Sequence, residues 1–269
     1  MRWNAMLTAL LLLLASLLPL DTANAGRLEW SVRYEGRTVR IHVITPDTPG
    51  PWPMAMVLHG ASGVGSGYMY WPLAEQLAKR GIAAAVVRYY DGLPRRTKRK
   101  QSVRIFTQRE KILDRVVSNL LRRNLVEGNV IGSVGYSLGG FHTIALAAKD
   151  KRIAAAVSIA GGLSGHIPHS VVEQAAPLLL IHGTRDRIVP HRRSMIARAA
   201  WRKAGQHAQL ISLKRVGHVP RGSIQTKAFE RAADFIAKHL KAAINPPLPR
   251  PRPNHPIPRQ PPGDLAKAQ

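Results

Sequence analysis

Short, continuous apolar runs alternate with stretches of helical spacing along most of this chain, and this alternation limits the folds open to it. Runs such as Met54–Leu58 and Ile82–Arg88 are almost wholly apolar, as strands are when both faces of their sheet are covered. Apolar residues at helical spacing follow, for example at Ile112, Val116 and Leu120. Strand–helix alternation repeated five times predicts an α/β fold with a mostly parallel sheet and helices on both faces.

The same patterns give the expected element boundaries, with a hairpin at Glu35-Gly36 and about eight strands in all. The expected strands are Leu28–Tyr34, Thr38–Ile44, Met54–Leu58, Ile82–Arg88, Val130–Tyr136, Ile153–Ala160, Leu178–His182 and Ala208–Leu213. The expected helices are Tyr70–Arg80, Ile112–Leu125, Phe141–Lys149, Arg193–Ala204 and a last helix with Phe229, Ala232, Ala233, Ile236 and Leu240 on one face.

The first 25 residues have the pattern of a secretory signal peptide. Arg2 precedes an apolar stretch from Leu7 to Leu20, and small residues follow at Ala23 and Ala25. The stretch is short for the alternative, an uncleaved anchor helix. We therefore expect cleavage after Ala25 and a periplasmic or secreted protein.

The last 25 residues, 245–269, contain nine prolines and few large apolar side chains. Proline fixes φ and removes a backbone donor, so the segment is expected to be extended or disordered. The sequence therefore predicts one folded domain over residues 26–244, between a signal peptide and a proline-rich tail.

The composition excludes several kinds of chemistry and leaves a strong positive charge to explain. There is no Cys, so neither a disulfide framework nor a thiolate nucleophile is available. Lys and Arg number 40 against 15 Asp and Glu, a formal charge of +25. No nucleic-acid-binding motif accompanies the charge, so nucleic acid is not expected as a partner.

One basic segment stands out just after the strand that ends at Arg88. It holds Arg95, Arg96, Lys98, Arg99, Lys100, Arg104, Arg109 and Lys111. Two interpretations of this segment are open. It attracts an anionic acyl substrate or an anionic membrane or envelope surface, or it is an ordinary solvated basic face.

The strongest chemical motif is Gly135-Tyr136-Ser137-Leu138-Gly139, a G-x-S-x-G between a predicted strand and a predicted helix. The turn is too tight for side chains two residues before and after the serine, and it lifts the serine hydroxyl above the sheet. The helix that begins at about Gly139 directs its positive end to the same point. Ser137 is therefore the candidate nucleophile.

A carboxylate and a histidine follow two later strands. Asp186 lies in a loop after Leu178–Ile181, where a buried carboxylate can orient an imidazole; the alternative is a cap or an ion pair with a neighbouring arginine. His218 lies in a loop after the last strand, from which a general base can reach the serine. His182 is the rival base, but it is only four residues from Asp186 and is expected to order that loop.

A glycine-rich turn, His59-Gly60-Ala61-Ser62-Gly63, follows the strand Met54–Leu58. Its glycines let the backbone approach a ligand and direct N–H groups at it. The N–H groups of Ala61 and Leu138 are the candidate oxyanion hole for a tetrahedral intermediate; the alternative is a plain tight turn.

The order Ser137, Asp186, His218, with a His-Gly turn upstream, resembles the α/β-hydrolase fold over nearly the whole body. The segments HGASG, RYYDG (88–92) and HGTRDRIVP (182–190) look most like the dienelactone hydrolase and prolyl-oligopeptidase-like esterase group. Dienelactone hydrolases proper use a cysteine nucleophile, whereas this chain has Ser137 at that position. The difference argues against dienelactone itself as the substrate.

The resemblance implies a serine esterase of three-layer α/β-hydrolase fold that acts on a small-molecule ester and needs no cofactor or metal. Only Gly161–Pro177 separates two strands where many relatives insert a lid, so a minimal lid is expected. Peptidase or acyltransferase activity with the same three residues is the alternative within enzymes. A non-catalytic protein that binds polyanions or a cell surface is the alternative outside them.

Overall fold

A single eight-stranded sheet organises the part of the chain that the computed structural model describes, residues 26–65, 67–97, 100, 102–163 and 175–246. Its strands are β1 (Arg27–Tyr34), β2 (Arg37–Ile44), β3 (Met54–Leu58), β4 (Ala83–Val87), β5 (Ile131–Tyr136), β6 (Ile153–Ile159), β7 (Leu178–Gly183) and β8 (Ala208–Leu213). Its helices are α2 (Tyr70–Ala78), α3 (Val103–Leu120), α4 (Leu138–Lys149), α5 (Arg192–Lys203) and α6 (Gly222–Ile244), with short 3₁₀ turns η1 (Gly63–Gly65) and η2 (Tyr89–Gly92).

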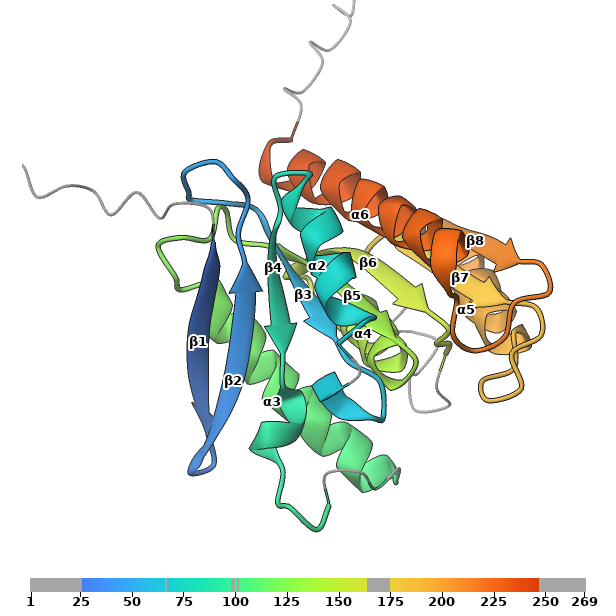
Figure 1. Ribbon diagram of the computed structural model, residues 1–269, viewed down its shortest axis with the longest axis horizontal. Coiled ribbons are helices and arrows are strands. Elements are labelled where there is room, and N and C mark those ends of the chain that lie inside the picture. The colour runs from blue at the N-terminus through green and yellow to red at the C-terminus, as the bar shows by residue number, and fades with distance from the viewer. Residues whose placement is uncertain (1–25, 66, 98–99, 101, 164–174, 247–269) are drawn as a thin grey trace, which may run out of the picture.

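The sheet is parallel except at one side, which confirms the expected architecture. The strand order is β1-β2-β4-β3-β5-β6-β7-β8. β1 and β2 form an antiparallel hairpin, and β2 runs antiparallel to β4. All pairings from β4 through β8 are parallel (Figure 1), so the carboxyl ends of these strands lie at one edge.

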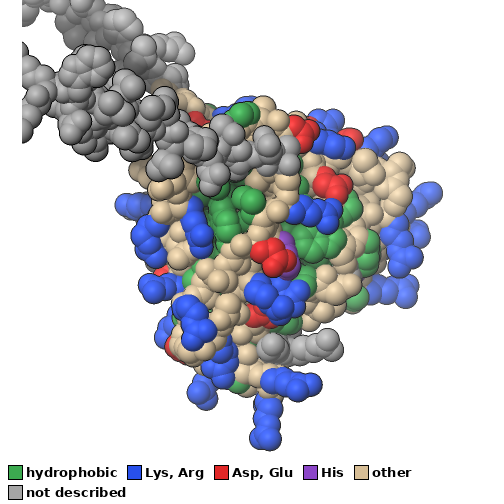
Figure 2. Space-filling model, turned by 60° about the vertical axis from the view of Figure 1, so that its left-hand side comes forward, with side chains coloured by type: hydrophobic (Ala, Val, Ile, Leu, Met, Phe, Trp, Pro, Cys, Tyr) green, Lys and Arg blue, Asp and Glu red, His purple; other side chains and the backbone are tan. Residues whose placement is uncertain are grey.

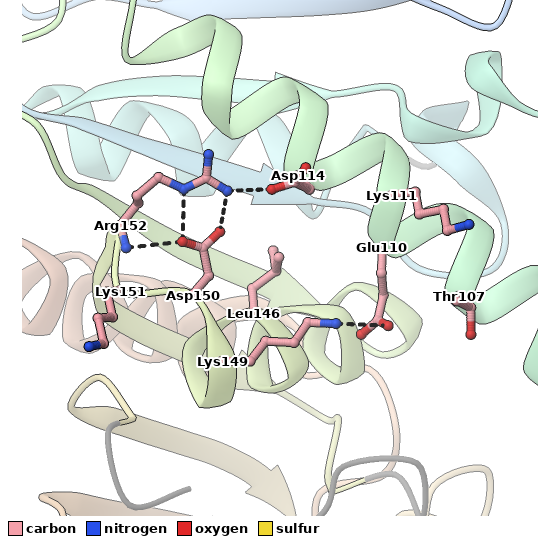
Figure 3. A pocket seen from close by; sticks show the side chains of 9 residues that line it. All are labelled: Thr107, Glu110, Lys111, Asp114, Leu146, Lys149, Asp150, Lys151 and Arg152. Carbon is pink, nitrogen blue, oxygen red and sulfur yellow. Dashed lines mark hydrogen bonds and ion pairs between the residues drawn. The ribbon is translucent and has the colours of Figure 1, made fainter. Parts of the chain in front are cut away.

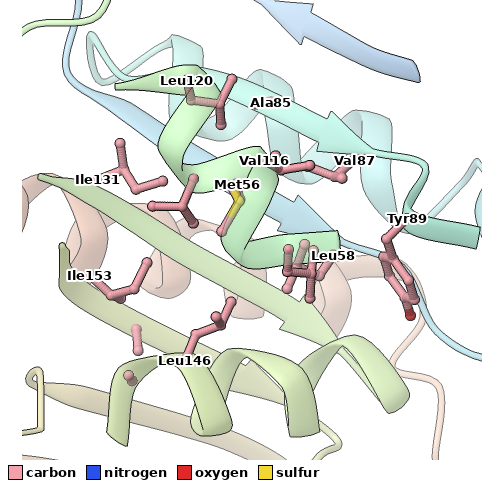
Figure 4. Packing of buried hydrophobic residues seen from close by; sticks show 14 of the residues in the cluster. Met56, Leu58, Ala85, Val87, Tyr89, Val116, Leu120, Ile131, Leu146 and Ile153 are labelled. Atoms are coloured by element: carbon pink, nitrogen blue, oxygen red, sulfur yellow. The ribbon is translucent and has the colours of Figure 1, made fainter. Parts of the chain in front are cut away.

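Helices cover both faces of the sheet and divide the core into two layers. Along β3, Met54, Met56 and Leu58 belong to the cluster under α3, α4 and α5, whereas Ala55 and Val57 belong to the cluster under α2 and α6. This alternation is the two-residue period of a strand buried on both sides. Figure 4 shows the first layer, where Met56 lies among side chains from the strands and from the helices that cover them.

The path of the chain reverses direction beside β3. The connection from β3 to β4 runs through α2 on one face, and the connection from β4 to β5 returns through α3 on the other face. β3 therefore lies between β4 and β5, and the loops that follow β3 and β5 diverge at the same edge. Ligands of open α/β sheets bind at such a reversal.

Two helices differ from the sequence-based expectation. The helix expected at Ile112–Leu125 is α3, which begins at Val103 and ends at Leu120. The Ser102 side chain accepts the Ile105 N–H as an N-cap, and the charged first half of α3 hides its apolar spacing. α4 begins at Leu138, directly after Ser137, rather than at Phe141.

Several expectations concern residues outside those the structure describes. The signal peptide lies in 1–25, most of the expected minimal lid in 164–174, and all but the first two residues of the proline-rich tail in 247–269. Among the helices of the described residues, none combines the length and the apolar character needed to cross a membrane.

Candidate active site

Ser137 occupies a sharp bend between β5 and α4. Its backbone has φ 52° and ψ −117°, and its N–H donates to the Ile159 carbonyl at 2.8 Å. A Cβ at Gly135 would lie 2.2 Å from the Gly139 carbonyl oxygen, and one at Gly139 would lie 2.2 Å from the Leu58 carbonyl oxygen. Side chains at either position would therefore force the strand and helix apart, which explains the glycine spacing around the serine.

The structure brings Ser137, His218 and Asp186 together from three loops. His218 Nε2 lies 2.9 Å from Ser137 Oγ, and His218 Nδ1 lies 2.7 Å from Asp186 Oδ2. Because Asp186 is ionised and accepts from Nδ1–H, Nε2 of a neutral His218 is free to accept the serine proton. The three side chains form the hydrogen-bonded triad that deprotonation of a serine hydroxyl requires.

Asp186 is buried yet held in its charged form. Burial alone would raise its pKa, but the hydrogen bond from His218 and the backbone N–H groups of Val189 and Ile188 outweigh that effect and lower it. The two N–H groups donate to Oδ1 at 2.9 and 2.8 Å. The carboxylate is therefore fixed in orientation and charge before any substrate binds.

His182 contacts the same carboxylate from the other side, and it orders the loop as expected. Its Nε2 lies 3.0 Å from Asp186 Oδ2 and 2.9 Å from the Val189 carbonyl oxygen, so this nitrogen carries a proton. Its Nδ1 lies 2.7 Å from Ser194 Oγ. His182 is wholly buried and is bonded to Asp186, whereas His218 is the histidine that reaches Ser137.

The residue before the nucleophile holds the loop of the base. The Tyr136 hydroxyl donates to the His218 carbonyl oxygen at 3.2 Å, and the two rings lie 5.2 Å apart. Burial, with Tyr68 and Tyr70 nearby, raises the pKa of Tyr136, so its hydroxyl keeps the proton that it donates. β5 therefore positions both the nucleophile and the loop of its partner.

The turn after β3 lies directly against the nucleophile. A Cβ at Gly60 would be 3.4 Å from Ser137 Cβ, so glycine allows the close approach. Among the described residues no acceptor is found for the N–H of Ala61 or for that of Leu138. These are the two N–H groups predicted to form the oxyanion hole: Leu138 directly follows Ser137, and Ala61 follows the glycine that approaches it.

Three tyrosine hydroxyls bond to the backbone of this turn on either side of the Gly60–Ala61 peptide, a feature that sequence reasoning missed. Tyr89 donates to the His59 carbonyl oxygen at 2.6 Å, and Tyr70 accepts the Gly60 N–H at 2.9 Å. Tyr90 donates to the Ala61 carbonyl oxygen at 3.1 Å. The segment RYYDG was noticeable in the sequence, but its contact with the turn depends on η2 folding back beside β3.

The peptide between Gly60 and Ala61 is fixed through its carbonyl. Gly60 O lies 2.8 Å from His59 Nδ1 and accepts the Gly63 N–H at 3.0 Å. In a trans peptide the N–H points away from the C=O, so these bonds also set the direction of the Ala61 N–H. Burial lowers the pKa of His59 to about 4, and its ring therefore stays neutral with the proton on Nδ1.

Arg109, expected in the exposed basic segment, is instead buried beneath η2. Its Nη2 donates to the Lys100 carbonyl oxygen at 2.6 Å, and its guanidinium lies 5.1 Å from the Tyr90 ring centre. Arg109 lies on the apolar side of α3, which faces the core. It is the only charged residue among the buried residues of α3. The exposed basic side chains of the segment's described part are Arg95, Arg96, Lys100, Arg104 and Lys111.

A hollow of about 500 Å³ lies between α3 and α4, away from Ser137. It opens where β6 begins, at the opposite edge of the sheet from the carboxyl ends. Ion pairs hold five of its charged side chains (Figure 3): Lys149 pairs with Glu110 at 3.0 Å, and Arg152 pairs with both Asp150 and Asp114. No group of three or more His, Asp or Glu suited to a metal ion occurs in the described part of the chain.

The comparison with protein families gives one match over most of the body. The model of the dienelactone hydrolase family matches residues 39–239, a range that includes the site described above.

Individual relatives cover a smaller part. A 2,6-dihydropseudooxynicotine hydrolase of Paenarthrobacter nicotinovorans is 30% identical over 143 residues, 53% of this chain and 37% of that protein. Acyl-coenzyme A thioesterase 1 of Rattus norvegicus is 35% identical over 132 residues, 48% of this chain and 28% of that protein. The chain therefore spans well under half the length of these relatives.

Among solved structures, Est1E from Butyrivibrio proteoclasticus superposes with a TM-score of 0.64 at 16% identity. The match covers 79% of this chain and 99% of that one. At this identity the likeness concerns the fold alone, and it agrees with the α/β-hydrolase architecture expected from the sequence.

We predict that Tyr90→Phe lowers kcat for ester hydrolysis by about three- to tenfold with little change in KM. The hydroxyl touches the turn and not the reacting atoms, so its loss should loosen the oxyanion donor and cost less than removal of a donor itself. Steady-state kinetics test this, with Tyr34→Phe on β1 as the control. An unchanged kcat would show that the Tyr90 bond does not preorganise the turn.

We predict that His142 makes the fold sensitive to acid. Its ring is buried against Phe106, neither ring nitrogen has a partner among the described residues, and burial lowers its pKa well below the ordinary value. The unfolded chain therefore binds a proton that the folded chain does not, so the free energy of unfolding falls as the pH drops below about 6.5.

The variant His142→Phe should show a shallower fall of unfolding free energy between about pH 7 and pH 4. Urea unfolding followed by fluorescence at several pH values measures the two slopes. Equal slopes in the variant and the parent protein would contradict the assignment.

Proposed function

Because this chain belongs to the dienelactone hydrolase family, we propose that it is an exported serine hydrolase that cleaves carboxylic esters. The observation that carries the proposal is the hydrogen-bonded triad of Ser137, His218 and Asp186. Ser137 Oγ lies 2.9 Å from His218 Nε2, and His218 Nδ1 lies 2.7 Å from Asp186 Oδ2. An ordinary serine hydroxyl is a weak nucleophile, and an imidazole with a fixed carboxylate behind it is the arrangement that activates one.

In the proposed reaction Ser137 Oγ attacks the ester carbonyl carbon while His218 Nε2 takes the hydroxyl proton. The negative charge moves to the carbonyl oxygen, which accepts from the N–H groups of Ala61 and Leu138. The intermediate collapses with cleavage of the bond to the leaving oxygen, and His218 returns the proton to it. Water then attacks the acyl-enzyme with His218 as base, which releases the acid and restores Ser137.

The relatives support an acyl-transfer reaction without fixing its leaving group. One bears the name of a hydrolase and another that of an acyl-coenzyme A thioesterase. Ser137 Oγ, activated by the same triad, can attack an ester or a thioester, since both present a carbonyl carbon and an adequate leaving group. We propose oxygen esters as the main substrates, with peptidase or acyltransferase activity as the alternative.

An anionic acyl substrate is the form of this proposal that the charge favours. Lys and Arg side chains predominate over Asp and Glu on the face in Figure 2. The exposed part of the basic segment follows η2, and η2 contacts the turn at Ala61 through Tyr90. A negatively charged ester approaching this edge would be attracted, over a distance that salt limits to about 8 Å at physiological ionic strength.

Export remains a proposal from the sequence, since residues 1–25 lie outside those described. Amino-terminal sequencing of the mature protein should give Gly26 first. On the outside of the cell the same basic side chains would also meet anionic membrane or envelope surfaces. The non-catalytic alternative, a polyanion-binding protein on this scaffold, is disfavoured because such a protein has no need for the triad of Ser137, His218 and Asp186.

We predict that Ser137→Ala abolishes hydrolysis of p-nitrophenyl esters, a loss on the order of 10⁴-fold or more. The parent protein should react with a fluorophosphonate probe at Ser137, and the variant should not. Ester, thioester and amide substrates of matched acyl group would rank the leaving groups. Near-full activity of the variant would exclude the proposed mechanism.

We predict that joint neutralisation of Arg95, Arg96 and Lys100 raises KM for esters of acidic acyl groups and leaves KM for neutral esters unchanged. The physical reason is loss of attraction without any change at Ser137. Neutralisation of Arg122, Arg202 and Lys203, which lie elsewhere on the molecule, is the matched control. Equal effects of the first triple change on acidic and neutral esters would argue against an anionic substrate.

A further inference from the structure

The two edge strands of the sheet differ in how they meet solvent. β1 carries Arg27, Glu29 and Arg33 among its eight residues, whereas β8, with the sequence AQLISL, carries no charge among six. Charged side chains on an edge discourage another strand from pairing with it. In Figure 1, β8 ends the sheet on the side away from β1. Its composition leaves this edge open to pairing.

The register of β8 shows which of its backbone groups are open. The Leu178 N–H donates to the His207 carbonyl oxygen and the Thr184 N–H donates to the Leu213 carbonyl oxygen, both at 3.0 Å. Backbone groups of a strand alternate in direction, so residues of the same parity as 207 and 213 bond to β7. The N–H and C=O groups of Ala208, Leu210 and Ser212 therefore point outward, where a further strand would pair.

A hollow flanks β8 on each side. On the α5 side it has a volume of about 410 Å³ and is lined by Met195, Arg198 and Arg202 together with Leu210 and Ser212. On the α6 side a hollow of about 480 Å³ is lined by residues that include Gln209, Ile211, Arg231 and Lys238. A strand added to this edge would place alternate side chains in the two hollows, which is how sheet-edge recognition obtains specificity.

Within the part of the chain that the structure describes, each hollow is lined by cationic side chains that have no acidic partner. Arg198 and Arg202 form no ion pair among the described residues, and Arg198 Nε is buried without an acceptor there. On the α6 side Asp234 is bonded to Arg80 at 2.6 Å, while Arg231 and Lys238 have no acidic partner in the described part of the chain. Carboxylates are the groups that these donors lack.

We propose that β8 binds an extended, acidic peptide segment of another protein, which adds to the sheet as a ninth strand. Backbone groups at Ala208, Leu210 and Ser212 would pair with the segment, and acidic side chains would enter the hollows beside Arg198, Arg202 and Arg231. A second copy of this chain fits less well, because it would bring the same arginines against each other on a molecule of charge +25. The proposal is independent of hydrolase activity.

The test uses the full chain with Ser137→Ala, which separates edge binding from turnover. The probe is a fluorescent capped peptide of alternating Glu and Val, and the comparison peptide has Lys in place of Glu. Anisotropy titrations should detect binding of the Glu peptide only. The double change Arg198→Glu with Arg202→Glu should weaken that binding by about tenfold or more, whereas Arg27→Glu with Arg33→Glu on β1 should weaken it less than about threefold.

A backbone test complements the charge test. Leu210→Pro removes an outward N–H and leaves the bonds to β7 intact, as proline at an edge permits, so it should abolish binding while the circular dichroism spectrum is retained. Amide exchange at Leu210 and Ser212 should slow when the Glu peptide is present. Equal weakening by the β1 and α5 charge changes, or protection of β8 by self-association without peptide, would overturn the proposal.

Discussion

The backbone at Ser137 is the constraint on which the site depends. A non-glycine residue at φ 52° is strained by about 1–3 kcal/mol, and the surrounding structure must offset that cost. It does so by close contact of β3, β5 and α4, which Gly135 and Gly139 permit because their missing Cβ atoms would overlap backbone atoms at 2.2 Å. The hydroxyl is thereby exposed at the sheet edge while the strand beneath it stays buried, and every other group of the site is arranged around that position.

The groups around Ser137 are fixed by bonds that do not involve substrate. Asp186 accepts from two backbone N–H groups and from two histidines, and the turn at Gly60 is held through each of its carbonyls. Donors held in this way need no reorganisation when charge develops on a substrate oxygen, which is the main source of electrostatic catalysis. The buried tyrosines and His59 beside β3 thus bond to the backbone around the Gly60–Ala61 peptide, whose N–H is the proposed oxyanion donor.

The sequence was informative where a function imposes a local pattern. The apolar runs predicted the sheet, and the residues after four strand ends predicted which side chains would meet, because parallel strands end at one edge. Contacts set by tertiary packing were not predictable. The burial of Arg109 depends on η2 covering it, and the early start of α3 is hidden by the charged residues in its first half. The bond that the Gly60 N–H donates to Tyr70 joins residues whose approach no spacing rule describes.

The large positive charge bears on how this molecule tolerates an open sheet edge. An uncharged edge strand such as β8 is ordinarily a liability, since it pairs with the same edge of another copy. Under our proposal, repulsion between copies comes from the helices beside the strand, which carry Arg198, Arg202, Arg231 and Lys238, rather than from the strand itself. That arrangement discourages self-pairing and leaves the backbone of β8 accessible to a chain of opposite charge. Charge on the flanks of an edge therefore selects among partners, whereas charge on the edge strand, as in β1, discourages them all.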